Sequence, residues 1–336
     1  MLQQKQIQVL FALLLVLTLS PAIAAQKPTK DDNPKEDNVP AIVWHDPGDI
    51  STLNLFYGAG GKEHAPAPNG KFTFVKEDMN GTSPKFDVQD DNGVKWKVKL
   101  GEETQSETAA TRLLWAAGYF VDEDYYFADL KVEGLPKLHR GEKMVSDDGT
   151  IHHARLERHI ENTKKLGNWD WFHNQCGPAK ELNGLRVMMS LVNNWDLKTI
   201  NNWVEEADGQ RHCVVTDVGA TFGKTGNTFG RSKSVEKDYV NSGFIAKVTP
   251  EYVDFVMHSR PFFLGAINIP NERTRSRMEE ITKHIPLADA RWLGQRLASL
   301  SVDQIRDCFR AAGYTPEEID GYTEAVQKRI AELNAL

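Results

Sequence analysis

The chain has 336 residues, of which 40% are hydrophobic, and its formal net charge at pH 7 is −7. This composition supports a packed core and excludes a chain that is disordered throughout. The mild acidity is spread along the chain and argues against a nucleic-acid partner, which would require a basic stripe.

Residues 1–25 predict a signal peptide. Lys5 supplies the positive start, the run from Val9 to Leu19 is apolar except for Thr18, and Ala22-Ile23-Ala24 fits a small-residue cleavage site. The apolar run is too short to span a bilayer comfortably. We therefore expect an exported protein, periplasmic or secreted, with no stable membrane span after cleavage.

Residues 26–69 predict a linker followed by an irregular N-terminal extension. The stretch from Gln26 to Pro40 holds seven Lys, Asp and Glu residues and three prolines. Further along, residues 57–62 read Y-G-A-G-G-K, which is glycine-rich like a phosphate-binding loop. No strand-loop-helix pattern surrounds this run, so a plain turn is favoured.

The region from Lys71 to Leu100 predicts antiparallel strands. Apolar and polar residues alternate in three runs, and Asn80-Gly81 and Asp91-Asn92-Gly93 are turn signals between them. A helix should follow, because residues 109–117 are strongly helical and Gly118 is a natural stop. Thr104 and Glu107 have the spacing of a capping box at its start.

The second half of the chain predicts mostly helices after a further strand at Tyr125–Val132. Residues 181–192 have apolar side chains at helical spacing, and Ser301 with Gln304 and Thr315 with Glu318 have capping-box spacings. The cysteines, Cys176, Cys213 and Cys308, are odd in number. One pair could bond in an oxidising compartment, which pair stays open, and three buried thiols remain an alternative.

Two motifs after the helix at 181–192 carry candidate chemistry. Asp196-Leu197-Lys198 is followed by Asn201, and a short strand at 213–216 ends in Asp217-Val218-Gly219. Phosphoryl transfer requires a carboxylate to orient or deprotonate the attacking hydroxyl, and oxygen ligands for divalent metals. The five-residue gap from Asp196 to Asn201 matches a kinase catalytic loop, and Asp217 falls where the metal-binding aspartate is expected.

A lysine and a glutamate upstream complete this pattern. Lys99 ends an alternating strand, and Glu107 lies eight residues later near the start of the helix. A strand lysine of this kind grips nucleotide phosphates while a helix glutamate holds the lysine in place. Lys97 points the same way as Lys99, so the choice between them is less secure. Before the strand, residues 80–86 offer glycine and hydroxyl donors for phosphate oxygens.

Together these segments resemble the atypical branch of the protein-kinase-like superfamily, which includes HipA-type kinases, phosphatidylinositol kinases, CotH kinases and secretory-pathway Fam20 kinases. Residues 81–86 are similar to the G-x-x-P-K loop of HipA-type proteins, and the strand ending in Lys99 resembles their lysine strand. The match covers roughly residues 70–223. It departs from the family where Asn194 and Trp195 replace a His-Arg pair, where Val218 replaces a phenylalanine, and in lacking an A-P-E segment.

The resemblance implies an α+β, two-lobed kinase-like fold, with a mainly β N-lobe at 70–135 that carries one key helix, and a helical C-lobe at 136–336. It implies binding of ATP with Mg²⁺ or Mn²⁺ and an acceptor with a hydroxyl group. The implied catalytic residues are Asp196 and Lys198, and the metal ligands are Asn201 and Asp217. The implied nucleotide-binding residues are Gly81, Ser83, Lys85, Lys99 and Glu107.

Two other functions remain open from the sequence. Export brings the chain to a space where ATP is scarce, which favours a binding module that keeps the fold without catalysis. The same fold also supports transfer of AMP in place of phosphate. The acceptor could be a protein, a glycan, a lipid headgroup or a small molecule. His152, His153 and His159 fit no standard metal spacing and are interpreted as surface or hinge residues.

Overall fold

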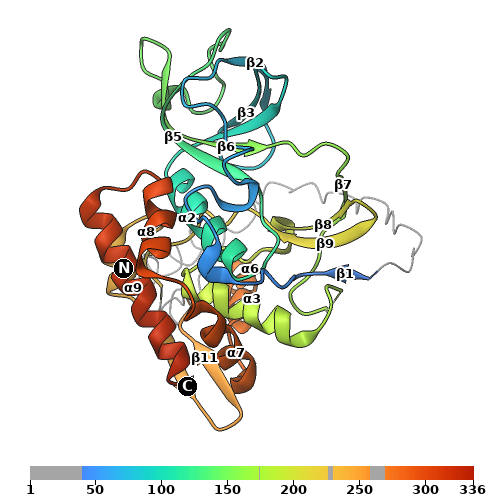
Figure 1. Cartoon of the computed structure of the whole chain (residues 1–336), viewed down its shortest axis with the longest axis vertical. Coiled ribbons are helices and arrows are strands. Elements are labelled where there is room, and N and C mark those ends of the chain that lie inside the picture. Colours follow the sequence, from blue (N-terminus) through green and yellow to red (C-terminus); the bar gives the residue numbers. More distant parts are fainter. Residues whose placement is uncertain (1–39, 174, 226–229, 258–268) are drawn as a thin grey trace, which may run out of the picture. The chain divides into compact units, whose positions relative to one another are not determined.

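The computed structural model describes residues 40–173, 175–225, 230–257 and 269–336 (Figure 1). The predicted signal peptide lies outside these residues. Within them, no helix is both long and apolar enough to cross a bilayer.

Five antiparallel strands form the sheet-bearing N-terminal part. They are β2 (Phe72–Asp78), β3 (Lys85–Asp90), β4 (Lys95–Leu100), β5 (Asp124–Lys131) and β6 (Thr150–Arg158), in the order β2-β3-β4-β6-β5. The predicted meander is confirmed as β2-β3-β4. The sheet also takes in β6, which lies beyond the N-lobe boundary placed at residue 135.

The register of this sheet explains why charged side chains become buried. Lys99 pairs with Lys85 on β3 and with Arg155 on β6, so three basic residues form one row across three strands. Adjacent positions form an apolar row, in which Val98 lies between Phe86 and Leu156, all three fully buried. Because side chains alternate between the faces of a sheet, the basic row projects away from this apolar cluster.

Helix α2 (Glu103–Ala116) connects the sheet to the rest of the chain. Its first turns carry Glu103 and Glu107, which reach back to the sheet. Its last turns, including Leu113 and Leu114, belong to the large C-terminal core. The helix ends as predicted, because Gly118 follows with φ +95°, a backbone conformation that glycine adopts without strain.

The C-terminal part is built on helices, as predicted. They are α3 (Ala179–Leu191), α4 (Glu236–Val240), α6 (Ile269–Glu280), α7 (Leu287–Leu297), α8 (Val302–Ala311) and α9 (Pro316–Asn334). Both predicted capping boxes are present, at Ser301 with Gln304 and at Thr315 with Glu318. The expected α+β class, with a mainly β first part and a helical second part, is confirmed (Figure 1).

This part also contains two small sheets that the sequence did not predict in full. One has the order β1-β9-β8-β7, from β1 (Ala41–Ile42), β7 (Lys164–Gly167), β8 (Asn202–Ala207) and β9 (Gln210–Val215). The other is formed by β10 (Ile245–Val248), β11 (Tyr252–Phe255) and β12 (Ile285–Pro286). β8 and β9 form a hairpin directly before Asp217, and this hairpin fixes the position of the D-x-G segment.

From residue 41 on, the predicted extension is packed into the C-terminal core. β1 pairs in parallel with β9, and the buried side chains of Val43, Ile50 and Leu55 join the main cluster. The glycine-rich run at 57–62 forms the short 3-10 helix η2 (Gly58–Gly60), which agrees with the plain turn that was favoured.

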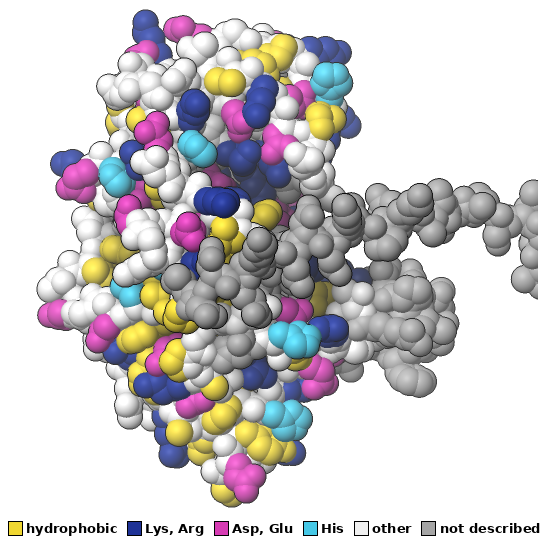
Figure 2. All heavy atoms as spheres, turned by 90° about the vertical axis from the view of Figure 1, so that its right-hand side faces the viewer, with side chains coloured by type: hydrophobic (Ala, Val, Ile, Leu, Met, Phe, Trp, Pro, Cys, Tyr) yellow, Lys and Arg dark blue, Asp and Glu magenta, His cyan; other side chains and the backbone are white. Residues whose placement is uncertain are grey.

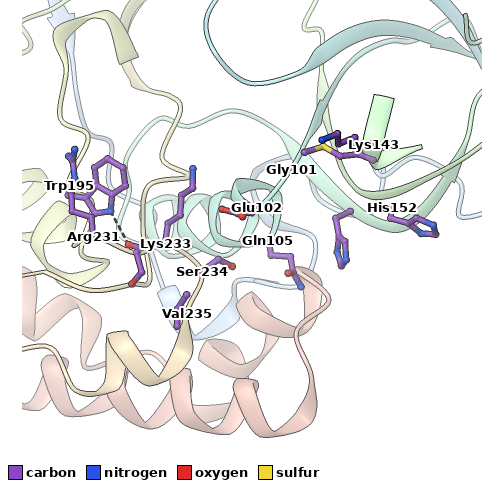
Figure 3. Close-up of a pocket in the computed structure, with 13 residues that line it drawn as sticks. Gly101, Glu102, Gln105, Lys143, His152, Trp195, Arg231, Lys233, Ser234 and Val235 are labelled. Carbon is purple, nitrogen blue, oxygen red and sulfur yellow. Dashed lines mark hydrogen bonds between the residues drawn. The ribbon is translucent and has the colours of Figure 1, made fainter. Parts of the chain in front are cut away.

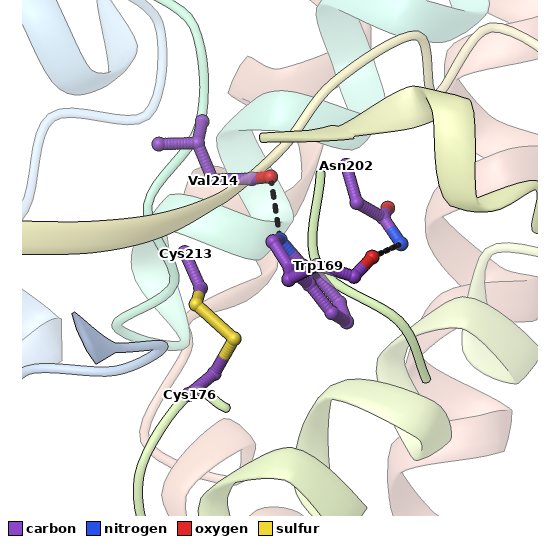
Figure 4. Close-up of a disulfide and its surroundings, with 5 residues drawn as sticks. All are labelled: Trp169, Cys176, Asn202, Cys213 and Val214. Atoms are coloured by element: carbon purple, nitrogen blue, oxygen red, sulfur yellow. Dashed lines mark hydrogen bonds between the residues drawn. A yellow bond between two sulfur atoms is a disulfide. The ribbon is translucent and has the colours of Figure 1, made fainter. Parts of the chain in front are cut away.

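A disulfide joins Cys176 to Cys213, which settles the pairing that the sequence left open (Figure 4). Cys308 is a buried thiol. The disulfide ties the segment before α3 to strand β9. Close to it, Trp169 is fully buried and its indole N–H donates to the carbonyl of Val214. The tryptophans at 169 and 171 therefore pack in the core.

Candidate active site

Lys99 lies at the centre of a cluster of three carboxylates. Its Nζ is 2.8 Å from Oε2 of Glu107, 2.6 Å from Oδ1 of Asp217 and 2.9 Å from Oε2 of Glu103. Lys99 is 5% exposed and Glu107 is 1% exposed, so their contact is shielded from water. The predicted strand lysine, helix glutamate and D-x-G aspartate thus meet at one point, although they come from three separate segments.

The alternative lysine on the same strand has different partners. Nζ of Lys97 lies 3.1 Å from Asp78 on β2 and 3.1 Å from Asp87 on β3, and its side chain is 35% exposed. Of these two strand lysines, Lys99 is therefore the one that contacts helix α2 and the D-x-G segment.

The charged groups in this cluster shift one another's pKa values. Burial opposes the charge on Lys99, but the attraction of Glu107, Asp217 and Glu103 outweighs it and raises the pKa of the ammonium group. For Glu107, burial dominates and raises the pKa of the carboxyl group, against the opposing effects of Arg155 and Lys99. Burial would also raise the pKa of Glu103, but Lys99 and Lys233 lower it to about 2. The site therefore holds a firmly protonated lysine.

A buried ionic network supports Glu107 from behind. Nε of Arg155 on β6 lies 3.4 Å from Oε2 of Glu107, and Nη1 of the same residue lies 3.0 Å from Oδ2 of Asp124. Asp124 in turn pairs with Arg112 of α2. Since each of these charges has an opposite partner, the network holds α2 against the sheet without leaving an unpaired buried charge.

The D-x-G segment is docked on the same helix. The hydroxyl of Ser106 donates to the carbonyl of Gly219 over 2.7 Å. A Cβ atom at position 219 would lie 2.5 Å from Cβ of Glu103, closer than two carbons can approach, so only glycine fits. Asp217 itself has φ +52°, a conformation uncommon outside glycine, which turns its carboxylate toward Lys99.

The predicted catalytic loop lies beside the D-x-G segment. The amide N–H and hydroxyl of Thr216 both donate to the carbonyl of Asn201, over 3.0 and 2.9 Å, so Asn201 is held next to the residue that precedes Asp217. The side chain of Asn201 donates to the carbonyl of Asp196 over 3.0 Å. Nζ of Lys198 lies 2.8 Å from Oδ1 of Asp196. These contacts place all three loop residues around one turn.

The donor set fits a hard divalent cation. Asn201 uses its side-chain nitrogen within the loop, which leaves its amide oxygen for a ligand, and Asp217 keeps its second carboxylate oxygen beside the one on Lys99. Mg²⁺ commonly takes one or two protein oxygens together with phosphates and waters. Among the described residues, no group of three or more His, Cys, Asp and Glu side chains is arranged to hold a metal.

The predicted nucleotide loop lies at the edge of the cluster. The hydroxyl of Ser83 is 3.5 Å from Oε2 of Glu103, so it borders the Lys99 site. Nζ of Lys85 is 3.6 Å from Asp78, and that pairing directs it toward the loop. The carbonyl of Gly81 accepts from Arg140, whose guanidinium also binds the carbonyls of Asp78 and Asn80.

Three residues of this site escaped the sequence prediction, namely Glu103, Arg155 and Lys233. Glu103 had a detectable signal, since it lies one helical turn before Glu107 on the same face. Arg155 is one of several charged residues in β6, and Lys233 lies in an irregular segment. Neither carries a local pattern. The capping box expected at Thr104 and Glu107 was wrong, because Glu107 instead binds Lys99 and the N-cap residue is Glu102.

The three histidines lie on the surface, as expected from the sequence. Nε2 of His152 lies 2.6 Å from the hydroxyl oxygen of Ser146, and its Nδ1 lies 2.6 Å from Oδ1 of Asp129. This is the order of a serine hydrolase triad. However, the Asp129 side chain is 67% exposed, and the amide N–H groups of Ser146 and Gly149 are used inside the turn. We therefore interpret this group as a hydrogen-bonded turn.

A pocket of about 960 Å³ opens next to the Lys99 cluster (Figure 3). One wall comes from the start of α2 and from the sheet, and the other from Trp195 and residues 231–235. Nζ of Lys233 in this second wall lies 2.7 Å from Oε1 of Glu103, the carboxylate that also contacts Lys99. Two ion pairs that share Glu103 therefore connect the pocket wall to Lys99.

No family model matches this sequence, and no curated protein matches it. Among solved structures, the Helicobacter pylori proinflammatory kinase CtkA is similar at 12% identity and a TM-score of 0.46, over 79% of this chain and 96% of that one. The Golgi casein kinase with Mn/ADP bound is similar at 10% identity and a TM-score of 0.43, over 80% and 72%. A second Golgi casein kinase structure has 11% identity and a TM-score of 0.35, over 84% and 77%. Likeness at this level carries no weight for function, which is inferred below from the site.

Proposed function

We propose that this chain is an exported atypical kinase that transfers the γ-phosphoryl group of ATP, with Mg²⁺ or Mn²⁺, to a hydroxyl acceptor. The observation that carries the proposal is the simultaneous contact of Lys99 with Glu107 and Asp217. A protonated lysine held by a buried glutamate is suited to bind phosphate oxygens. A lysine on the solvent-facing side of a strand would remain exposed to water and would not be buried among three carboxylates.

Each residue then has a defined role. Lys99 binds phosphate oxygens, and Glu107, supported by Arg155, keeps the ammonium group in place. Asp196 accepts the proton of the attacking hydroxyl, and Lys198 beside it offsets negative charge on the transferring group. Asn201 and Asp217 would hold the divalent cation, which when bound neutralises charge on the phosphates. Ser83 at the edge of the cluster contributes a hydroxyl donor.

The disulfide favours the exported setting. Disulfides persist in oxidising compartments and are rare in the reducing cytosol. Cys176 and Cys213 form such a bond, and the sequence begins with a predicted signal peptide. On the face drawn in Figure 2, Lys and Arg side chains lie among Asp and Glu side chains, which gives no support for a nucleic-acid partner there.

The direct test uses a thermal-shift assay to measure binding of ATP with Mn²⁺ or Mg²⁺ to the mature protein. Asp217→Asn should abolish the metal-dependent stabilisation. Asp208→Asn is a matched control, because Asp208 has the same backbone conformation, with φ +52°, in the exposed β8–β9 turn. A folded protein that shows no shift with any nucleotide and metal would contradict the proposal.

Product analysis separates the remaining alternatives. A kinase converts ATP to ADP and adds a phosphoryl group to its acceptor, an AMP transferase adds AMP and releases pyrophosphate, and a binding module leaves ATP intact. Mass spectrometry of the nucleotide and acceptor pools distinguishes these three outcomes.

A further inference from the structure

The pocket beside the Lys99 cluster has a lining that is rich in basic side chains. Lys143, Arg231 and Lys233 line it, and Glu102 is the single carboxylate among its lining residues. The remaining lining combines polar side chains with the apolar surfaces of Met144, Trp195 and Val235. Figure 3 shows Lys143 and His152 on one side of the space and Arg231 stacked beside Trp195 on the other.

Two contacts of one pocket wall connect it to the candidate catalytic residues. Trp195 directly precedes Asp196, and its indole N–H donates to the carbonyl of Ser232 over 3.0 Å. The guanidinium of Arg231 lies over the Trp195 ring, 4.2 Å from its centre. The wall at 231–233 is therefore fastened to the catalytic loop. From the same wall, Lys233 reaches Lys99 through Glu103.

The charge of the lining indicates what kind of molecule fits. Lys233 is already paired with Glu103, whereas Lys143 is exposed and forms no ion pair with any of the described residues. With Lys233 offset by Glu103, the two cations Lys143 and Arg231 stand against the one carboxylate of Glu102, and this positive excess attracts anions and raises their local concentration. Its volume lies at the upper end of the range typical of small-molecule sites.

We propose that this pocket is the acceptor site, and that its acceptor is a small hydroxyl compound that already carries a negative charge. This inference rests on the kinase activity proposed above. The anionic group would contact Lys143 and Arg231, and the hydroxyl would face Asp196. In the reaction the hydroxyl oxygen bonds to the γ-phosphorus, the bond from that phosphorus to the β–γ bridging oxygen breaks, Asp196 takes the hydroxyl proton, and ADP leaves.

The test measures binding of three probes to the mature protein by calorimetry without nucleotide. The probes are glucuronate, glucose 6-phosphate and glucose, which share a hydroxyl-rich ring and differ in charge. We expect one or both anionic probes to bind at least about tenfold more tightly than glucose, since hydrogen bonds to charged groups are worth about that factor. The carboxylate and phosphate probes show which anion the site prefers.

Two variants locate the binding. Lys143→Gln combined with Arg231→Gln should weaken the anionic probes about tenfold. Lys137→Gln is the control, because Lys137 lies in the same connection between β5 and β6, forms only an exposed pair with Glu142 and does not line the pocket. Both proteins should still bind ATP with Mn²⁺.

The outcomes separate the two proposals. If ATP with Mn²⁺ binds but no anionic probe does, the acceptor inference is wrong and the kinase proposal stands. If anionic probes bind at the pocket and no nucleotide does, the kinase proposal is wrong. A small anionic hydroxyl acceptor would be contradicted if glucose bound as tightly as the anionic probes, or if the double variant bound them as tightly as the wild type. It would also be contradicted if inorganic phosphate bound as tightly as the sugars, or if an acidic peptide were phosphorylated in their place.

Discussion

Lys99 and Asp217 are 118 positions apart in the sequence, yet Nζ of Lys99 lies 2.6 Å from Oδ1 of Asp217. The lysine side chain is 7% exposed and the aspartate side chain is 48% exposed. The pair therefore bridges the interior and the surface, and a ligand must reach Lys99 from the side of Asp217. Binding of a phosphate group would replace part of this contact.

Replacement of Lys99 should abolish nucleotide binding. Lys99→Met leaves Glu103, Glu107 and Asp217 without their shared cation, so we expect a loss of about 3 kcal/mol in the free energy of unfolding together with loss of the ATP-dependent thermal shift. Lys97→Met is the control. Its partly exposed pairs with Asp78 and Asp87 should be worth about 1 kcal/mol, less than the buried contacts of Lys99. Loss of ATP binding in the Lys97 variant and not in the Lys99 variant would reverse the assignment of the phosphate lysine.

Glu103 should make stability depend on acid pH. Against the effect of burial, Lys99 and Lys233 lower its pKa from 4.5 to about 2. The stabilisation is therefore complete above the unfolded pKa and is lost as the pH falls through about 4.5 toward 2. We expect Glu103→Gln to be less stable than the wild type by on the order of 2 kcal/mol at pH 7, with the difference nearly gone near pH 2. Urea unfolding at several pH values measures this, and a difference independent of pH would refute it.

The disulfide should stabilise the oxidised protein. Closing a loop between cysteines 37 positions apart restricts the unfolded chain, so reduction should cost about 3 kcal/mol. Alkylation under denaturing conditions without reductant should modify one thiol, that of Cys308, and three after reduction. Modification of three thiols before reduction would show that the bond does not form in the purified protein.

Gly219 should be essential for the geometry of the site. In Gly219→Ala the new methyl group would meet Cβ of Glu103, which cannot move without shifting α2. We expect a stability loss of about 1–3 kcal/mol and a loss of nucleotide binding that exceeds what the stability loss explains. Gly230→Ala is the control, because no atom of the described residues lies within 4 Å of a Cβ there. Full activity of the Gly219 variant would argue against tight docking of the D-x-G segment on α2.

The sequence predicted elements whose signals are local. The capping boxes at Ser301 and Thr315 and the stop at Gly118 depend on neighbours within a few positions, and all three are present. Lys99, Glu107 and Asp217 could be selected because each occupies a recognisable place in a strand, a helix or a turn. Their roles as nucleotide and metal residues stay predictions.

The remaining features depend on contacts between distant segments. Lys233 reaches Glu103 across 130 positions, and no local pattern marks either partner for the other. The insertion of β6 beside β4 likewise depends on the finished sheet. The pairing of Cys176 with Cys213 follows from the position of β9 and could not be chosen among three cysteines by spacing.

The parallel pairing of β1 with β9 has a consequence for how the chain is made. Ala41 pairs with Arg211, so the strand that is synthesised first finds its partner only after most of the chain has emerged. A contact of such high sequence separation closes slowly and late. Completion of the sheet that leads into the D-x-G segment therefore waits until synthesis has passed β9, in the second half of the chain.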